Sequence, residues 1–439
     1  MPATQSATRR PPGPDHAVEL GIDPGTLDTL TALQADYGNV IGITRPSGRA
    51  AYFVNDPTEV RRILVRHHAR YHKGPGFERV KMLLGNGLIV SDGDVWRRSR
   101  TMIQPAFKVQ NVHRLVTIMV ACSDRRASLW AQAAAAGKTV NITQETSDFA
   151  LELILRCIFG RDYEERLLTG AGNPFDFLSK ESARDLGVVM KARQLRELLL
   201  DIVAARRSAR ADEFDFLSMY LQATDRDGRP FSDRELLDEL MTLIVAGFET
   251  SANTLNWAWF LLADHPDVEA RVLEEVRGVL PPDALPTAEH AARMTYTQQV
   301  LEETLRLYPP VWLFTRRAVA DDTLADYDVP PGTDIYLSPY ILHRTPEFWP
   351  APGEFDPARF AGEESNRRER PYFPFSLGPR RCLGEYFSFL EMKLHLALLL
   401  PSFRMQRADA TDPGLELGIN LRSARDIHLR PFVRVAGGA

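Results

Sequence analysis

The feature that most restricts the fold is a long, uninterrupted helical pattern just past the middle of the chain. It begins at Ser232, which is followed three residues later by Glu235 in the pattern of a helix-capping box, and it continues to His265 and Pro266. At about 1.5 Å per residue, such a helix is roughly 50 Å long. Residues 240–245 are apolar on nearly every side, which indicates burial. We therefore expect this helix to run through the interior of a large domain.

Helical and β-prone patterns are distributed unevenly along the rest of the chain. Helical periodicity dominates residues 94–263 and returns for a last helix over residues 385–400. Two β-prone runs within residues 39–55 flank a Pro-Ser-Gly turn, and residues 334–340 form another β segment. A long loop covers residues 350–381. The fold class predicted from these patterns is mainly α with small β-sheets.

Domain organisation and charge exclude several classes of protein. We find no repeat or long linker, so residues 21–439 are expected to form a single domain, preceded by a flexible arm of residues 1–20 that is rich in Pro, Thr and Ala. The net charge of -5 disfavours nucleic-acid binding. No apolar run is long enough for a membrane anchor. Three scattered cysteines indicate neither a disulfide framework nor a zinc site. We expect a soluble, cytoplasmic protein.

One cysteine has unusual surroundings. Residues 373–384 contain two prolines and two glycines, so they form neither regular helix nor strand. Cys382 ends this loop just before an apolar helix, where free backbone N–H groups, the helix dipole and the charges of Arg380 and Arg381 favour a thiolate. A thiolate can bind iron and promote O–O bond cleavage. Cys122 and Cys157 lie in apolar helical stretches and are predicted to be core residues.

The middle of the long helix is interrupted by residues that a core helix does not favour. Gly247 costs about 1 kcal/mol relative to alanine. A buried carboxylate at Glu249 costs more unless it is partnered, and Thr250 competes for backbone hydrogen bonds. Three local penalties side by side indicate a functional segment.

The cysteine loop resembles a known signature. Phe375, Gly378, Arg380, Cys382 and Gly384 match the haem-binding signature of the cytochrome P-450 family at every fixed position. The resemblance implies that Cys382 is the axial ligand of haem b (iron protoporphyrin IX). It also implies that the arginine lies near a haem propionate, and that the glycines let the backbone approach the porphyrin.

The long helix carries a second match. Ala246, Gly247, Glu249 and Thr250 resemble the oxygen-activating motif of the same family, which lies over the haem. The resemblance implies that Thr250 hydrogen-bonds the iron-bound oxygen species and that Glu249 links it to solvent. Two alternatives stay open: Glu249 as a solvent-facing or salt-bridged carboxylate, and Thr250 as a packing residue.

Two further groups follow from the resemblance. Glu303 and Arg306 share a helix face and match the family's Glu-any-any-Arg element, although such pairs are commonly surface salt bridges. With Arg359 they are expected to form a buried network that holds the cysteine loop. The residues expected near the haem propionates are Trp96, Arg100, Arg316 and His343. Arg316 is hard to tell apart from Arg317 in this role, and plain surface residues are the alternative for Arg316 and His343.

These matches predict a monooxygenase that splits O2 with two electrons from a ferredoxin or flavodoxin and its reductase. An acidic carrier would dock near Arg97, Arg98 and Arg381. The substrate would be lipophilic, such as a terpenoid, fatty acid or polyketide. The apolar residues predicted to line its pocket, or alternatively the core, are Leu243, Phe248, Val311, Phe314 and Ile419. The segment between residues 162 and 206 is shorter than in many members, which leaves the pocket size open.

Three other functions remain compatible with the residues. A peroxygenase would use hydrogen peroxide on the same fold, but it needs no proton relay like Glu249 and Thr250. A thiol hydrolase would use Cys382 as its nucleophile, although no histidine partner can be identified. A non-catalytic haem-binding protein would bind haem through Cys382 without oxygenating a substrate.

Overall fold

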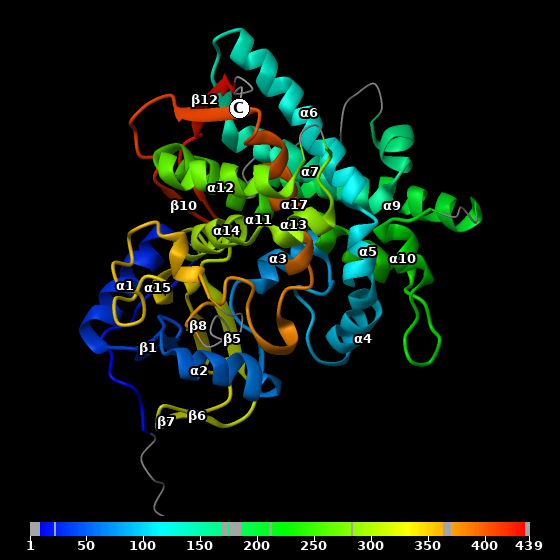
Figure 1. The fold of residues 1–439 in the computed structure, drawn as a ribbon. Coiled ribbons are helices and arrows are strands. Elements are labelled where there is room, and N and C mark those ends of the chain that lie inside the picture. The colour runs from blue at the N-terminus through cyan, green and yellow to red at the C-terminus, as the bar shows by residue number, and fades with distance from the viewer. Residues whose placement is uncertain are drawn as a thin grey trace, which may run out of the picture.

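A computed structural model describes residues 9–21, 23–168, 174–175, 186–209, 213–281, 284–362 and 370–434. It is mainly helical with small sheets, as the sequence predicts (Figure 1). The segment between residues 162 and 206 lies partly outside the described residues. Residues 363–369 of the predicted long loop also lie outside them. The α-helices are α1 (Pro24–Tyr37), α2 (Pro57–Arg61), α3 (Phe77–Leu84), α4 (Gly93–Ile103), α5 (Val109–His113), α6 (Val116–Ala135), α7 (Ile142–Phe159), α9 (Leu186–Ala209), α10 (Phe216–Gln222), α11 (Asp233–Asp264), α12 (Pro266–Val279), α13 (Ala288–Arg293), α14 (Thr295–Leu307), α15 (Pro339–Leu342) and α17 (Glu385–Leu399).

Helix α11 is the long helix that the sequence predicts, and it crosses the helical part of the molecule (Figure 1). Ser232 caps its N-terminus in the expected capping box with Glu235, and His265 caps its end before Pro266 begins α12. Its 32 residues span about 48 Å. Its most extensive contact is with α7, and it also contacts α9, α10, α12, α14 and α17. Because other helices surround it, its apolar middle is buried.

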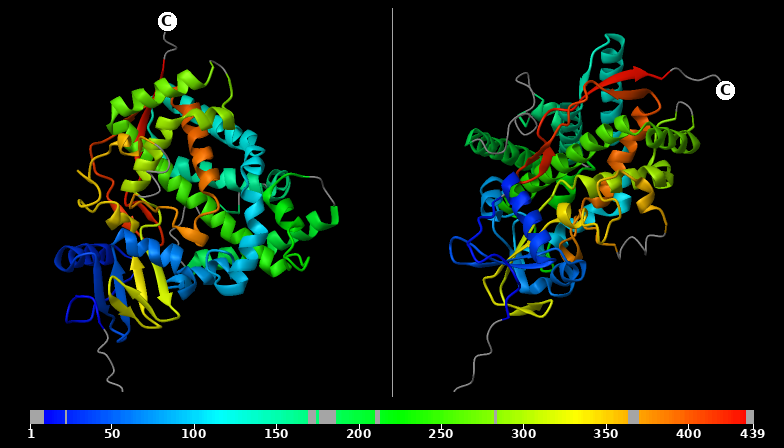
Figure 2. Two further views of the ribbon diagram at one scale, coloured as in Figure 1. Left: turned by 60° about the horizontal axis from the view of Figure 1, so that its bottom comes forward. Right: turned by 90° about the vertical axis from the view of Figure 1, so that its left-hand side faces the viewer.

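Four small sheets complete the fold of the described residues. The largest has the strand order β1-β2-β8-β5-β3, so it joins strands from the start of the chain to strands some 280 residues later. Figure 2, left, shows these blue and yellow strands side by side, below the helical part. The predicted hairpin at residues 39–55 is present as β1 and β2, and the segment at residues 334–340 becomes β8 followed by α15, which starts at Pro339. The strands are β1 (Val40–Thr44), β2 (Ala50–Val54), β3 (Tyr71–Lys73), β4 (Val140–Asn141), β5 (Phe314–Ala318), β6 (Asp322–Leu324), β7 (Tyr327–Val329), β8 (Asp334–Leu337), β9 (Phe403–Arg407), β10 (Leu415–Leu417), β11 (Leu421–Ser423) and β12 (His428–Val433).

Short helices of other types connect these elements. The segment after α2 is a π-helical turn, η1 (Arg62–Arg66), followed by a 3-10 turn, η2 (His68–Arg70). The predicted long loop contains two 3-10 turns, η5 (Pro357–Phe360) and η6 (Gly378–Arg380). The remaining short helices are η3 (Gln104–Phe107) and η4 (Tyr163–Leu167).

The N-terminal segment differs from the expectation of a flexible arm. Residues 9–20 lie along β1: the Val18 N–H donates to the Thr44 carbonyl at 2.9 Å, and the Gly42 N–H donates to the Pro12 carbonyl at 2.8 Å. Val18 and Leu20 are buried. Composition pointed to disorder, but two backbone hydrogen bonds and apolar burial order this part of the arm. Residues 1–8 lie outside the described residues.

The core consists of two clusters. The larger one contains residues from α7, α11 and α17, together with Ile41 and Phe53 of the hairpin and both Cys122 and Cys157, which are buried as predicted. The smaller one lies between the five-stranded sheet and η1 and includes Leu64 and Phe373. Within the part of the chain that the structure describes, no helix combines the length and apolar character that a membrane crossing requires.

Candidate active site

The cysteine loop has a defined backbone shape. Ser376 and Gly378 adopt positive φ angles of 60° and 67°, and the loop closes where the Cys382 N–H donates to the Phe375 carbonyl at 3.0 Å. Gly384 then caps α17, so Cys382 lies just before the N-terminus of an apolar helix, as predicted. A Cβ at Gly384 would meet the Cys382 sulfur at an ordinary 3.9 Å. The protein around Gly384 therefore does not itself require glycine, which fits the predicted approach of a porphyrin.

The thiol of Cys382 does not ionise as easily as the sequence indicated. The residue has accessible surface, but protein surrounds the sulfur closely enough that burial raises its pKa to about 11. The Gly384 N–H, Arg100 and Arg381 lower the pKa but do not outweigh burial. In the protein alone, burial therefore opposes the easier ionisation that the sequence indicates. Metal binding displaces thiol protons, so ionisation would accompany binding of an iron ion.

A group of cations lies beside the cysteine loop. Arg316 of β5 is 4% exposed, and its guanidinium donates to the neighbouring Thr315 carbonyl at 2.8 Å. Lys73 of β3 pairs with it in register across the sheet. Burial lowers the pKa of Arg316 to about 10 and lowers that of Lys73 well below its usual value. Both side chains are therefore costly as cations unless an anion lies near them.

Two arginines extend this group towards the loop. Arg380 pairs with Asp92, donates to the Ser91 carbonyl at 3.0 Å, and lies over the ring of Trp96 at 4.3 Å from its centroid. Arg100 donates to the Arg381 carbonyl at 2.9 Å, and burial lowers the pKa of both Arg100 and Arg380. The predicted residues Trp96, Arg100 and Arg380 thus lie together.

The charge balance of this cluster fits a dianionic ligand. Arg316, Lys73 and Arg380 each interact with one carboxylate, Asp92, and Arg100 adds a further positive charge beside Arg380. A buried surplus of positive charge is unfavourable unless a ligand supplies the anions. A haem has two propionate groups, so the residues present fit the cofactor that the sequence predicts. Sequence reasoning missed Lys73, because only its pairing with Arg316 across the sheet brings it to the site.

The oxygen-motif segment of α11 carries three side chains that bond back to the helix. Thr250 Oγ1 donates to the Ala246 carbonyl at 3.0 Å, and Thr254 Oγ1 donates to the Thr250 carbonyl at 2.8 Å. Asn253 Nδ2 donates to the Glu249 carbonyl at 2.9 Å. Such bonds compete with the helical ladder and loosen it locally. The Thr250 hydroxyl is therefore anchored one turn back on its own helix.

Glu249 is ion-paired inside the protein. Its Oε1 accepts from Arg422 Nε of β11 at 2.8 Å and also pairs with Arg422 Nη2. This is the salt-bridge alternative that the sequence left open. A link from Glu249 to solvent stays a prediction, and it would pass through Arg422, whose side chain is 33% exposed.

Gly247 contacts a helix rather than an open space. A Cβ there would lie 2.7 Å from Ile154 Cγ1 and 2.8 Å from Ile154 Cδ1 of α7. The missing side chain allows α11 and α7 to approach closely, and a role of Gly247 at the cofactor stays a prediction.

The predicted structural network is assembled: Glu303 and Arg306 are fully buried, and the Arg359 side chain is 12% exposed. Arg306 donates from Nε to Glu303 Oε2 at 2.6 Å and from Nη2 to Oε1 at 2.7 Å. Arg359 Nε lies 3.4 Å from Glu303 Oε1, and the Asp356 N–H donates to the same oxygen at 2.9 Å. The alternative of a surface salt bridge is excluded, because Glu303 and Arg306 are 0% exposed.

His343 belongs to this network and not to the cation cluster. Its Nε2 accepts from the Phe373 N–H at 3.0 Å, and its carbonyl accepts from Arg306 at 2.9 Å. Burial lowers its pKa well below the usual value, so the ring is neutral. A neutral imidazole offers no charge to a propionate, so a contact of His343 with a propionate stays a prediction.

The predicted pocket residues lie in different environments. Leu243 and Phe248 belong to the main core cluster, whereas Ile419 is 48% exposed. Val311 and Phe314 are partly buried. The segments of Val311 and Ile419 are joined, because the Leu421 N–H donates to the Pro310 carbonyl and Trp312 donates to the Gly418 carbonyl. Lining of one substrate pocket by all five stays a prediction.

The three arginines predicted to meet an electron carrier differ in availability. Arg98 is engaged by Asp225 at 2.8 Å and Glu235 at 2.6 Å, so its charge is paired within the protein, and its contact with a carrier stays a prediction. Arg97 is 63% exposed and forms an ion pair with Asp94 on its own helix. Arg381 is 49% exposed, lies just before α17, and forms an ion pair with Glu385, the first residue of α17.

Known proteins are similar to this chain over almost its whole length. The sequence model described as "Cytochrome P450" matches residues 16–423. Cyclooctatin synthase of Streptomyces melanosporofaciens is 33% identical over 417 residues, covering 90% of this chain and 88% of that protein. Pentalenene oxygenase of Streptomyces avermitilis is 30% identical, with 89% and 88% covered. The crystal structure of the cytochrome P450DA heme domain superposes with a TM-score of 0.85 at 25% identity, covering 97% of this chain and 96% of that one.

Proposed function

Because the chain belongs to the cytochrome P450 family, and is therefore a haem-iron monooxygenase, we propose that it hydroxylates a lipophilic small molecule of secondary metabolism. A terpenoid is favoured over a fatty acid or polyketide, because the similar proteins named above carry terpenoid names. The overall reaction converts R–H, O2, two electrons and two protons into R–OH and water. The apolar character of the predicted pocket residues supports a substrate of this kind.

The observation that carries the proposal is the cation cluster beside Cys382, in which Arg316 is buried and the other three cations are partly buried. We infer that Cys382 would hold the haem iron through its sulfur, while Arg316, Lys73, Arg380 and Arg100 would hold the propionates. When bound, haem supplies the iron centre at which O2 is reduced and cleaved. The protein's contribution is to orient this group, neutralise its charge and bring protons to it.

Proton supply is assigned to α11. The Thr250 hydroxyl is held by the Ala246 carbonyl at 3.0 Å, so its oxygen lone pairs are available to a hydrogen-bond donor. Glu249 lies next to it in an ion pair with Arg422. We infer that Thr250 holds a proton at its Oγ1 and that Glu249 exchanges protons with solvent on the Arg422 side.

Electrons come from a redox partner, as in the family. We propose a ferredoxin or flavodoxin with its reductase, docking where the exposed Arg97 and Arg381 present positive charge. A cytoplasmic location also stays a prediction.

The first test is the absorption spectrum of the reduced, CO-treated protein beside that of Cys382→Ala. We expect a far red-shifted Soret band that the variant loses. An unchanged band in the variant would overturn the assignment of Cys382 as the ligand.

The second test supplies 18O2, a ferredoxin and its reductase with a panel of terpenoids, fatty acids and polyketides. One labelled oxygen in the product supports the monooxygenase. Turnover with hydrogen peroxide alone, and none with reductant, would support a peroxygenase instead, whereas haem binding without any product would indicate a non-catalytic protein.

A further inference from the structure

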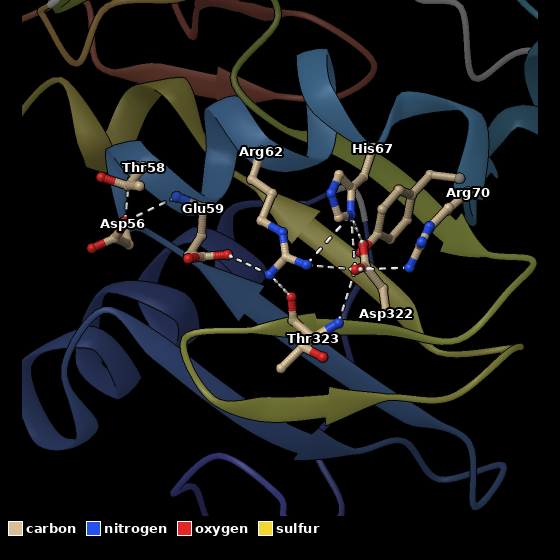
Figure 3. A network of polar contacts seen from close by, with 9 residues as sticks. Asp56, Thr58, Glu59, Arg62, His67, Arg70, Asp322 and Thr323 are labelled. Atoms are coloured by element: carbon tan, nitrogen blue, oxygen red, sulfur yellow. Dashed lines mark hydrogen bonds and ion pairs between the residues drawn. The ribbon is translucent and has the colours of Figure 1, made fainter.

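One buried carboxylate organises the segment between α2 and β3 (Figure 3). Asp322, the first residue of β6, has a side chain that is 0% exposed. It accepts from Arg62 Nη2 at 2.7 Å, from Tyr71 Oη at 2.8 Å and from Arg70 Nη1 at 3.4 Å, and it lies 2.9 Å from His67 Nδ1. Four side chains from one stretch of ten residues therefore converge on a single acid.

The same stretch contains the π-helical turn η1. The turn is closed by the His67 N–H, which donates to the Arg62 carbonyl at 2.8 Å. Arg62 and His67, the two residues at its ends, are both partners of Asp322. Isolated π-helical turns are rare and persist where the surroundings define them. Asp322 lies outside the turn and contacts both of these residues, so it holds the turn in shape.

The middle of η1 lies against the cysteine loop. A Cβ at Gly378 would be 2.2 Å from the Leu64 carbonyl oxygen and 3.0 Å from Val65 Cα. The contact is therefore backbone against backbone, with no side chain between to absorb a shift. Gly378 in turn accepts from the Arg381 N–H at 3.0 Å, next to Cys382.

We propose that Asp322 is a positioning residue for Cys382, acting through η1 and Gly378. The inference rests on the proposed function, in which the sulfur of Cys382 binds haem iron. A shift of η1 moves Gly378, and a shift of Gly378 moves the loop that sets the sulfur.

The charge of Asp322 is needed for this role. Burial alone would raise its pKa, but hydrogen bonds from the Thr323 amide, Tyr71 and His67 outweigh burial and lower it. The group is thus a carboxylate that accepts from donors on both oxygens. An asparagine would turn one acceptor into a donor and face it towards other donors.

The test compares the holoenzyme with Asp322→Asn and with Asp321→Asn as a matched control. Asp321 is exposed and contributes only its backbone carbonyl to Arg70, at 2.8 Å, so its substitution changes the charge equally without touching the carboxylate network. We would measure amide hydrogen exchange of residues 62–66 and 376–384, the haem midpoint potential, and the fraction of protein with the far red-shifted reduced-CO band.

For Asp322→Asn we expect exchange to rise on the order of tenfold in both segments, a shifted potential, and partial loss of the band. Asp321→Asn should match the wild type. Faster exchange in residues 62–66 alone, with an unchanged spectrum and potential, would refute the coupling.

Two further variants cover a failure of Asp322→Asn to fold. His67→Gln and Tyr71→Phe each remove one contact to Asp322, so each should change the potential and the loop exchange in the same direction by a smaller amount. Wild-type values in both would also refute the proposal. Cys382→Ala separates the two hypotheses: retention of the band in that variant contradicts the proposed function, whereas wild-type behaviour of the Asp322 and His67 variants contradicts only the positioning role.

Discussion

The close contact between Gly247 and Ile154 leads to a quantitative prediction. In Gly247→Ala, the new methyl would lie 2.7 and 2.8 Å from two Ile154 carbons, which is an overpacked contact. Overpacking costs about 1–3 kcal/mol, and the better helix propensity of alanine returns about 1 kcal/mol. We expect the free energy of unfolding to fall by about 0–2 kcal/mol.

Removal of the opposing side chain should reverse this effect. Ile154→Ala alone should cost about 2–5 kcal/mol, since it leaves a cavity in the core. In that background the Gly247→Ala methyl meets no clash, so it should stabilise the protein by about 1 kcal/mol. The double-mutant cycle therefore predicts a coupling energy of about 1–3 kcal/mol between the two positions.

The assay is urea unfolding of the wild type, both single variants and the double variant, with haem content measured in each. Gly278→Ala is the control, because an added Cβ at that position in α12 meets nothing within 4 Å. Additive effects of Gly247→Ala and Ile154→Ala would refute the packing argument. If Gly247→Ala loses haem and the added Ile154→Ala substitution does not restore the haem content, the result would support the predicted role of Gly247 at the cofactor.

Three other predictions concern buried charges. Glu303→Gln leaves the Arg306 guanidinium buried without a carboxylate, so its free energy of unfolding, measured by thermal unfolding, should be lower by about 3–5 kcal/mol. A Glu303→Gln/Arg306→Met double variant that loses the full sum of the single effects would contradict this. Burial raises the pKa of Glu391 from 4.5 to about 8, so the folded state binds more protons than the unfolded state between these pH values. The free energy of unfolding should therefore fall as the pH rises through this range. Glu391→Gln should flatten this slope in unfolding experiments at pH 5 and 8, and parallel slopes for the variant and the wild type would disprove the prediction. Lys73→Met removes a desolvated cation, so it should raise the melting temperature of the haem-free protein. Because the same cation is proposed to hold a propionate, the variant should transfer haem to an acceptor protein faster, on the order of tenfold. An unchanged rate of haem loss would show that Lys73 is not part of the site.

Local sequence signals predicted the parts of the site that depend on neighbouring residues. The capping box at Ser232 placed the start of α11, and the prolines and glycines around Cys382 predicted an irregular loop before a helix. The spacing of Glu303 and Arg306 correctly placed them on one face. Each of these depends on residues within about one helical turn of one another.

Contacts between distant segments were not predictable in the same way. Arg422, the partner of Glu249, lies 173 residues further along the chain, and nothing near either residue indicates the other. Lys73 reaches the site only because β3 pairs with β5 in one register. The contact of Gly247 with Ile154 was also not predictable, because a glycine that allows helices to approach and a glycine that allows a ligand to approach give the same local sequence pattern. Register and helix packing decide these cases, and neither is encoded locally.

The strand order of the five-stranded sheet has a consequence for how the protein is made. The hairpin of β1 and β2 leaves the ribosome early, but β8, which pairs with β2, follows about 280 residues later. At roughly 5–20 residues per second, β2 waits on the order of 14–56 s with an unpaired edge. Exposed strand edges invite association with other chains. Lys73 and Arg316 meet only when this sheet closes, so the newly made chain gains its complete cation cluster only after β5 and Arg380 have been made.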